Sequence, residues 1–268
     1  MRVIGRVAIN VFRESVRDKV LYNLVVFAVL LIATSYLIGQ LTAGQDIKVI
    51  KDLGLAAISI FGVAIAVFIG IGLVWKEVDK RSIYSILAKP VRRSEFVLGK
   101  YCGLVLTLFV NVVVMTLAFY AVLAYMNWKT DPMIRAAWPA PALDIRMLSA
   151  IALIFVELAL VTGIALFFST FSSPFLSAML TLGLWVSGQF SGDLRNFDQV
   201  LQSPVAVWMA KGLYYILPAF SAFDVKAQVV YGLPVGARYM ALTSAYGVAY
   251  LALTLLAAVM VFSRRDFK

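Results

Sequence analysis

Long apolar runs recur along this chain and constrain its fold more than any other feature. About 20 apolar residues in an α-helix cross the hydrocarbon layer of a bilayer, and the helix satisfies its own backbone polar groups there. We therefore expect an all-α membrane protein whose 268 residues form a single transmembrane domain. The six predicted spans are residues 22–41, 53–75, 101–125, 147–168, 174–190 and 241–262.

The composition agrees with this class and argues against an enzyme. The chain is 62% hydrophobic and 14% charged, whereas soluble domains are about half apolar and about a quarter charged. Cys102 is the only cysteine and there is no histidine, which excludes an intrachain disulfide, a Cys/His zinc site and a histidine-based triad. The G-x-x-x-x-G-K-[ST] phosphate loop is absent. We expect no catalytic site, cofactor or metal in this chain.

The first 19 residues are predicted to form a helix that lies in the membrane interface. One helical face carries arginines and the opposite face is apolar, the pattern of an interfacial helix that meets phosphate headgroups. These two faces consist of Arg2, Arg6, Arg13 and Arg17, and of Ile4, Val7, Ala8 and Val11.

The basic residues predict the orientation. With six spans, 15 Lys and Arg fall on the side of both termini and 9 on the other side, and cytoplasmic segments carry the excess of positive charge. We expect a multi-pass protein of the bacterial inner membrane with both termini in the cytoplasm. The formal charge of +10 then serves contact with membrane lipid rather than nucleic acid.

The polar interval 76–100 is too long for a turn and too charged to be buried. A helix continuing from the second span is expected to stop before Pro90, because proline disfavours helical geometry in the residue before it. Ser94 is predicted to cap the helix that enters the third span. The resulting hairpin presents apolar Ile83, Ile86 and Leu87 to a partner's groove; the alternative is a solvated basic loop.

Glu157 is the only formal charge well inside a predicted span. A charge at mid-membrane costs at least ~2.5 kcal/mol on insertion scales, so Glu157 should face the bundle interior or a polar partner. Thr107, Asn111 and Ser187 are available as such partners. Glu157, with Asn111, either lines a translocation path or makes a structural hydrogen bond between spans.

Three further patterns concern packing and turns. Gly62, Ala66 and Gly70 give the second span a stripe of small residues, which suits either packing within the bundle or a subunit interface. Ser173 should cap a helix with Pro174 in its first turn. Residues 191–240 are predicted to form an outer segment with short re-entrant or interfacial helices.

Several motifs occur in an order that resembles a known family. The string E-x-x-x-R-S-I-x-x-I-L-A-K-P-V-R-R-x-x-x-x-x-G-K at Glu77–Lys100 resembles the loop after the second span in permease subunits of ABC-2 type ABC transporters. Four other segments resemble the elbow helix, the fourth span, its turn and the segment before the last span. They are Phe12–Tyr22, Phe155–Leu160, Phe168–Pro174 and Tyr215–Asp224. Among the branches, the chain is similar to the permeases of nitrous-oxide-reductase maturation systems.

The resemblance implies a unit of two permease chains, a homodimer or heterodimer, each seated on an ATP-binding subunit that holds ATP and Mg. The hairpin would couple ATP hydrolysis by that subunit to export or extrusion of an unidentified substrate. The implied coupling residues are Glu77, Arg81, Ile83, Ile86, Leu87 and Pro90. The alternative is a complex that transmits ATP-driven force to a periplasmic partner protein without moving a solute.

Overall fold

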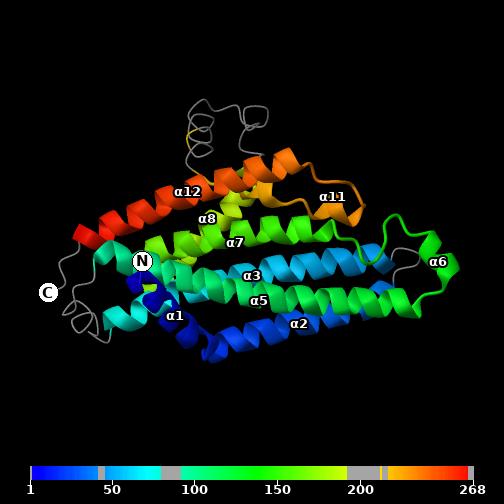
Figure 1. Cartoon of the computed structure of the whole chain (residues 1–268), viewed down its shortest axis with the longest axis horizontal. Helices are drawn as coiled ribbons and strands as arrows, with labels where there is room; N and C mark the ends of the chain where they lie inside the picture. Colours follow the sequence, from blue (N-terminus) through cyan, green and yellow to red (C-terminus); the bar gives the residue numbers. More distant parts are fainter. Residues whose placement is uncertain (1, 42–45, 80–91, 192–211, 213–216, 265–268) are drawn as a thin grey trace.

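The computed structural model describes residues 2–41, 46–79, 92–191, 212 and 217–264, and within 73–79 it describes the backbone. These residues form helices and connecting turns, with no strand among them, which confirms an all-α membrane fold (Figure 1). The helices are α1 (Arg2–Val16), α2 (Lys19–Gln40), α3 (Asp46–Asp79), α5 (Arg93–Lys129), α6 (Pro132–Ala136), α7 (Met147–Ser169), α8 (Pro174–Gln189), η2 (Phe220–Phe223), α11 (Lys226–Val230) and α12 (Ala237–Arg264).

The long helices run along one axis, with α3 and α7 at the centre and α2 and α12 at the periphery (Figure 1). The most apolar stretches of α3 and α7 are 72% buried, against 17% for α2 and 22% for α12. Apolar residues of α2, such as Phe27 and Leu30, are exposed. Apolar side chains on both the inside and the outside are typical of a bundle surrounded by lipid.

Five of the described helices are long and apolar enough to cross a membrane: α2, α3, α5, α7 and α12. The fifth predicted span, residues 174–190, forms α8, which has 16 residues. At about 1.5 Å per residue it is about 24 Å long, short of a hydrocarbon layer of about 30 Å. The count of six spans therefore stays a prediction.

Each predicted span overlaps a helix, and most of the observed helices are longer than the predicted span. The residues from Asp46 to Asp52, which resemble a polar link, are the first turns of α3. Likewise α5 begins at Arg93, within the predicted polar interval. The prediction that Ser94 caps this helix is wrong: the N-cap is Arg92, two residues earlier, and the Glu95 carboxylate accepts a hydrogen bond from the Arg92 N–H at 3.3 Å.

The two ends of the bundle differ. The start of α1 and the end of α12 lie at one end, together with the end of α3 and the start of α5, and we call this the terminal end (Figure 1). The opposite end, the α6 end, carries α6 and α11. At the terminal end, the Arg93 guanidinium donates to the carbonyl oxygens of Phe262 at 3.2 Å and Ser263 at 2.8 Å. The start of α5 is thereby joined to the end of α12.

The apolar face of α1 packs against α5. A Cβ at Gly103 would lie 2.6 Å from the Ala8 carbonyl oxygen and 2.7 Å from Val11 Cβ, so only glycine permits this approach. Arg6 and Arg13 on the other face are exposed. The prediction of two faces is correct, but the apolar face meets a helix of the same chain.

The small-residue stripe of α3 packs against α7. A Cβ at Gly70 would lie 2.6 Å from Ala165 Cβ, and a Cβ at Gly62 would clash with Leu158. Ala66, between them, is fully buried. Of the two interpretations, packing within the bundle is the one that the structure bears out.

Candidate functional site: a buried carboxylate between two helices

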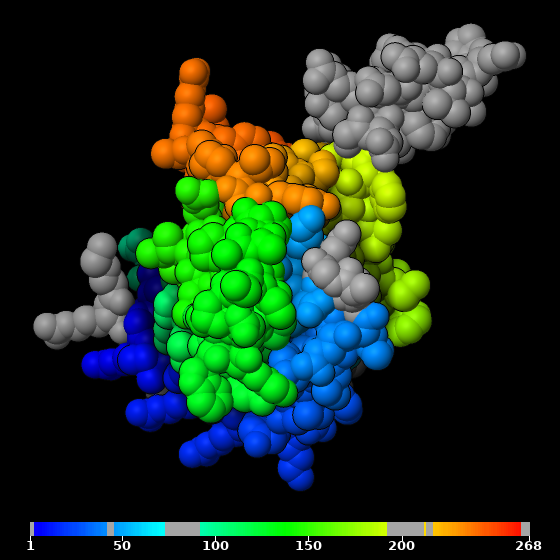
Figure 2. Space-filling model, turned by 90° about the vertical axis from the view of Figure 1, so that its right-hand side faces the viewer, coloured from blue at the N-terminus to red at the C-terminus, as the bar shows by residue number. Residues whose placement is uncertain are grey.

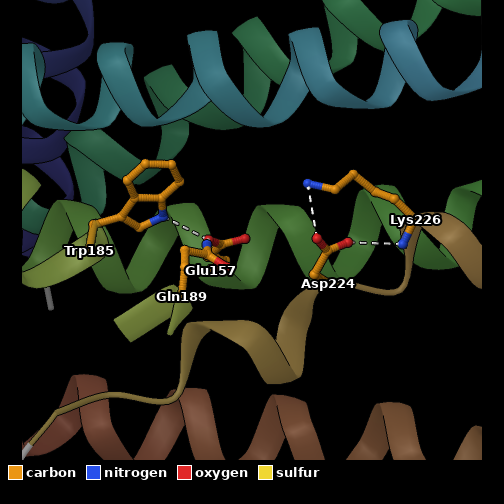
Figure 3. A network of polar contacts seen from close by, with 5 residues as sticks. All are labelled: Glu157, Trp185, Gln189, Asp224 and Lys226. Atoms are coloured by element: carbon orange, nitrogen blue, oxygen red, sulfur yellow. Dashed lines mark hydrogen bonds and ion pairs between the residues drawn. The ribbon is translucent and has the colours of Figure 1, made fainter. Parts of the chain in front are cut away.

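Glu157 lies midway along α7 with 2% of its surface exposed. Its Oε1 accepts two hydrogen bonds from α8, from Trp185 Nε1 at 2.8 Å and from Gln189 Nε2 at 2.8 Å (Figure 3). Trp185 and Gln189 are four residues apart, so they share one face of their helix. The carboxylate therefore joins α7 to α8.

The turn between α7 and α8 places these donors. Ser173 Oγ accepts from the Leu176 N–H at 3.4 Å, and Pro174 occupies the first turn of α8, as predicted. The hydroxyls of Ser172 and Ser177 are 2.7 Å apart and join the two sides of the turn. Since the turn is short, α8 begins beside the end of α7 and runs back along it.

The predicted partners of Glu157 are wrong. Asn111 Nδ2 donates to the Thr107 carbonyl oxygen of its own helix at 2.8 Å, and Thr107 Oγ1 donates to the Gly103 carbonyl oxygen at 2.9 Å. Ser187 is exposed on α8. These side chains satisfy their hydrogen bonds locally or face outward.

A signal for the correct partners was present in the sequence. Glu157 lies 14 residues before Phe171 and Trp185 lies 14 residues after it. Two antiparallel helices joined by a short turn bring residues at equal distance from the turn side by side. The turn at Ser169–Ser173 therefore pointed to Trp185 as a neighbour of the buried charge.

A second polar group lies further along α7. Lys226 Nζ is 3.4 Å from Asp224 Oδ2, and the Lys226 N–H donates to Asp224 Oδ1 at 3.1 Å. Figure 3 shows the Lys226 side chain extended along α7 in the direction of Glu157. The Lys226 side chain is 26% exposed and the Asp224 side chain is 43% exposed. The pair is partly solvated, whereas Glu157 is enclosed.

The environment of Glu157 limits its chemistry. Its two hydrogen-bond donors are neutral, and within the described ranges no cation forms an ion pair with it. A buried carboxylate held only by neutral donors favours either a proton on the carboxylate or the arrival of a cationic or hydrogen-bonding group. No group of metal-binding side chains is found among the residues that could be searched. The geometry that the structure describes is a hydrogen-bonded link between α7 and α8 through the Glu157 carboxylate.

The predicted coupling residues fall mostly outside the described residues. Arg81, Ile83, Ile86, Leu87 and Pro90 lie there, and Glu77 is described only as part of the α3 backbone.

The glycine and lysine at the end of the same motif are described. Gly99 lies against α1, where a Cβ would be 2.8 Å from Val7 Cβ. Lys100 is 2% exposed, with Nζ 4.9 Å from the centre of the Phe96 ring. These two residues of the motif contribute to packing at the terminal end.

Lys51 is a buried charge that the sequence analysis missed. It is 1% exposed, and its Nζ donates to the Pro141 carbonyl oxygen at 2.7 Å. Figure 2 faces the α6 end and shows the segment around α6 (green) beside the start of α3 (blue). The same end is held by Arg146, whose guanidinium donates to the Gly232 carbonyl oxygen. Lys51 was overlooked because it lies between the predicted spans 22–41 and 53–75.

These features define a multi-pass α-helical membrane protein with a polar site inside the bundle. A family model described as ABC-2 family transporter protein matches residues 6–267. The chain belongs to this family. A comparison with curated proteins finds no match. Members of the ABC-2 family are membrane components of ABC transporters and work with an ATP-binding subunit.

Proposed function

We propose that this chain is the permease subunit of an ABC exporter or extrusion machine. A separate ATP-binding subunit would supply ATP hydrolysis, and two copies of this chain would form the membrane unit. Both termini would lie in the cytoplasm of a bacterial cell. The observation that carries the proposal is the family match over residues 6–267.

The arrangement at the terminal end supports coupling through residues 80–91. The end of α3 and the start of α5 flank this segment, and both lie at the terminal end of the bundle (Figure 1). The residues proposed to contact the ATP-binding subunit are Glu77, Arg81, Ile83, Ile86, Leu87 and Pro90. Fifteen of the 24 Lys and Arg fall on this side, which favours a cytoplasmic location.

The continuity of α3 supports transmission of movement to the site. This helix has 34 residues, or about 51 Å at about 1.5 Å per residue. It packs along α7 through the stripe of Gly62, Ala66 and Gly70. A displacement imposed on the end of α3 would therefore act on α7, the helix that carries Glu157. Coupling of this kind requires two arrangements of the packed helices that nucleotide binding biases.

Glu157 would change its contacts in this cycle. Its bonds to Trp185 and Gln189 belong to one arrangement of α7 and α8. A sliding of α8 by one turn would break both bonds together, since both donors lie on one helix. The exposed carboxylate could then meet the transported molecule.

The test uses the complex of this chain with its ATP-binding subunit, reconstituted in liposomes. Leu87→Asp and Ile83→Asp are expected to insert normally but to abolish the change in ATPase rate that the permease produces. Leu233→Asp is the matched control, because Leu233 is outside residues 80–91, is 56% exposed and follows Gly232, which lies against Ala140. Wild-type ATPase coupling in both variants would refute the proposed role of residues 80–91.

The same preparation separates transport from the force-transmitting alternative. ATPase stimulation by a solute would support transport. Stimulation by a periplasmic protein, without solute movement, would support transmission of force.

A further inference from the structure

A cavity of about 120 Å³ lies at the elbow between α1 and α2, against the second half of α3. Ser15 and Asp18 supply its polar lining, and Phe68, Ile69 and Gly72 of α3 supply apolar lining. None of these residues belongs to the site around Glu157. The cavity is therefore an independent feature of the terminal half of the bundle.

The hydroxyl of Ser15 is buried without a partner. Ser15 is 4% exposed, and its Oγ makes no hydrogen bond within the part of the chain that the structure describes. Other buried helical serines bond to their own helix: Ser35 Oγ donates to the Ile32 carbonyl oxygen at 2.6 Å and Ser169 Oγ to that of Leu166 at 2.7 Å. A buried polar group left unpaired destabilises a protein. Ser15 Oγ is therefore available to a partner beyond the residues that the structure describes.

The charged residues around the cavity indicate which charged groups a partner of Ser15 would have. Asp18 offers a carboxylate, which also caps α2 by accepting from the Val20 N–H at 3.0 Å. Arg17 and Lys19, on either side of Asp18 in sequence, are exposed. A carboxylate and a hydroxyl accept hydrogen bonds from an ammonium group, and flanking cations attract a phosphate.

The apolar side of the cavity is formed by α3, one of the helices long and apolar enough to cross a membrane. Phe68 of this helix is 58% exposed. No atom of the described residues lies within 4 Å of the position that a Cβ at Gly72 would take. The cavity therefore has apolar space next to its polar lining, as an amphiphile requires.

We infer that this cavity binds a phospholipid whose headgroup carries a primary ammonium. The ammonium donates to Ser15 Oγ and to the Asp18 carboxylate, the phosphate lies near Arg17 and Lys19, and an acyl chain follows Phe68. The inference is independent of the proposed transport function, because it requires neither ATP nor a substrate.

The inference is tested by comparing two lipids that differ only in their headgroup. Phosphatidylethanolamine has N–H donors, whereas phosphatidylcholine carries the same charge without them. The purified full-length chain is mixed with detergent micelles that contain both lipids with identical acyl chains, and the retained lipid is counted by native mass spectrometry. We expect phosphatidylethanolamine to be retained about tenfold better, as loss of a hydrogen bond to a charged group implies.

Two variants locate the binding. Ser15→Ala is expected to reduce the preference between the lipids, because one of the two acceptors for the ammonium is lost while the Asp18 carboxylate stays. It should not unfold the chain, because it removes an unpaired hydroxyl. Gly72→Phe is expected to fill the cavity and to remove the strongly retained lipid. Gly183→Phe is the control, since a Cβ at Gly183 also meets nothing within 4 Å and this residue lies on α8, outside the cavity.

Equal retention of the two lipids by the wild-type chain would indicate a nonselective lipid belt and would overturn the inference. An unchanged preference in Ser15→Ala, or unchanged retention in Gly72→Phe, would overturn it as well, because the lipid would then bind elsewhere.

Discussion

Replacement of Glu157 separates the hydrogen bonds of the buried carboxylate from its charge. In Glu157→Gln, the amide oxygen can accept from Trp185 and Gln189 in the same positions as the carboxylate oxygen. In Glu157→Leu, both donors lose their acceptor inside the bundle. The first variant therefore removes the charge alone, and the second removes the charge and two bonds.

The expected magnitudes follow from these contacts. Hydrogen bonds between membrane helices contribute about 0.6 kcal/mol on average and up to about 1.7 kcal/mol. The two bonds to Glu157 Oε1 should therefore contribute about 1 to 3 kcal/mol. We expect Glu157→Gln to keep the free energy of unfolding of the wild type or to raise it, because an enclosed charge is costly. The free energy of unfolding of Glu157→Leu should be lower than that of Glu157→Gln by the contribution of the two hydrogen bonds, about 1 to 3 kcal/mol.

The assay is reversible unfolding in mixed micelles by titration with SDS, followed by far-ultraviolet circular dichroism. Glu14→Gln is the control, because Glu14 is exposed on α1. Equal stability of Glu157→Leu and Glu157→Gln would refute the argument that these bonds join α7 to α8. Transport by Glu157→Gln that equals the wild type at every pH would exclude a role for ionisation of this residue.

The remaining predictions concern packing, a buried cation and topology. Gly103→Leu should detach α1 from α5 and lower the melting temperature by several degrees, whereas Gly183→Leu should not; equal melting of both variants would contradict the close approach of α1. Lys51→Met should lower the free energy of unfolding by about 1 kcal/mol, because the Pro141 carbonyl loses its donor; unchanged stability in the SDS titration would argue against this bond. Ser85→Cys in a Cys102→Ala background should react with an impermeant maleimide only after cells are opened, and labelling of intact cells would invert the proposed topology.

The arrangement of spans could be predicted from sequence because it depends on length and polarity. Each predicted span falls on a helix, and Glu157 was recognised because a lone charge in an apolar run is costly wherever the neighbours lie. The count of six spans stays a prediction, since α8 has 16 residues.

The helix ends could not be predicted in the same way. A polar segment such as residues 46–52 is compatible with a solvated loop or with a helix that continues beyond the apolar layer. The choice depends on tertiary contacts such as that of Lys51 with the Pro141 carbonyl oxygen.

The sequence also could not predict which neighbour each helix face contacts. The apolar side of α1 would suit lipid or protein equally, and only the glycines of α5 distinguish the two. The partners of Glu157 required the neighbour of α7 to be known. The equal spacing of Glu157 and Trp185 from the turn indicated that neighbour, whereas side-chain chemistry alone suggested polar residues such as Asn111.

The bond between Arg93 and the end of α12 affects how the chain can be shortened. The acceptors are backbone carbonyls of Phe262 and Ser263, so no side-chain replacement in α12 removes them. A truncation before Phe262 would remove both, together with the ring that stacks on Phe96 at 5.9 Å. The end of α12 thus serves as an anchor for a helix that starts 169 residues earlier. A purification tag is therefore better added after residue 264 than substituted for the last turn of α12.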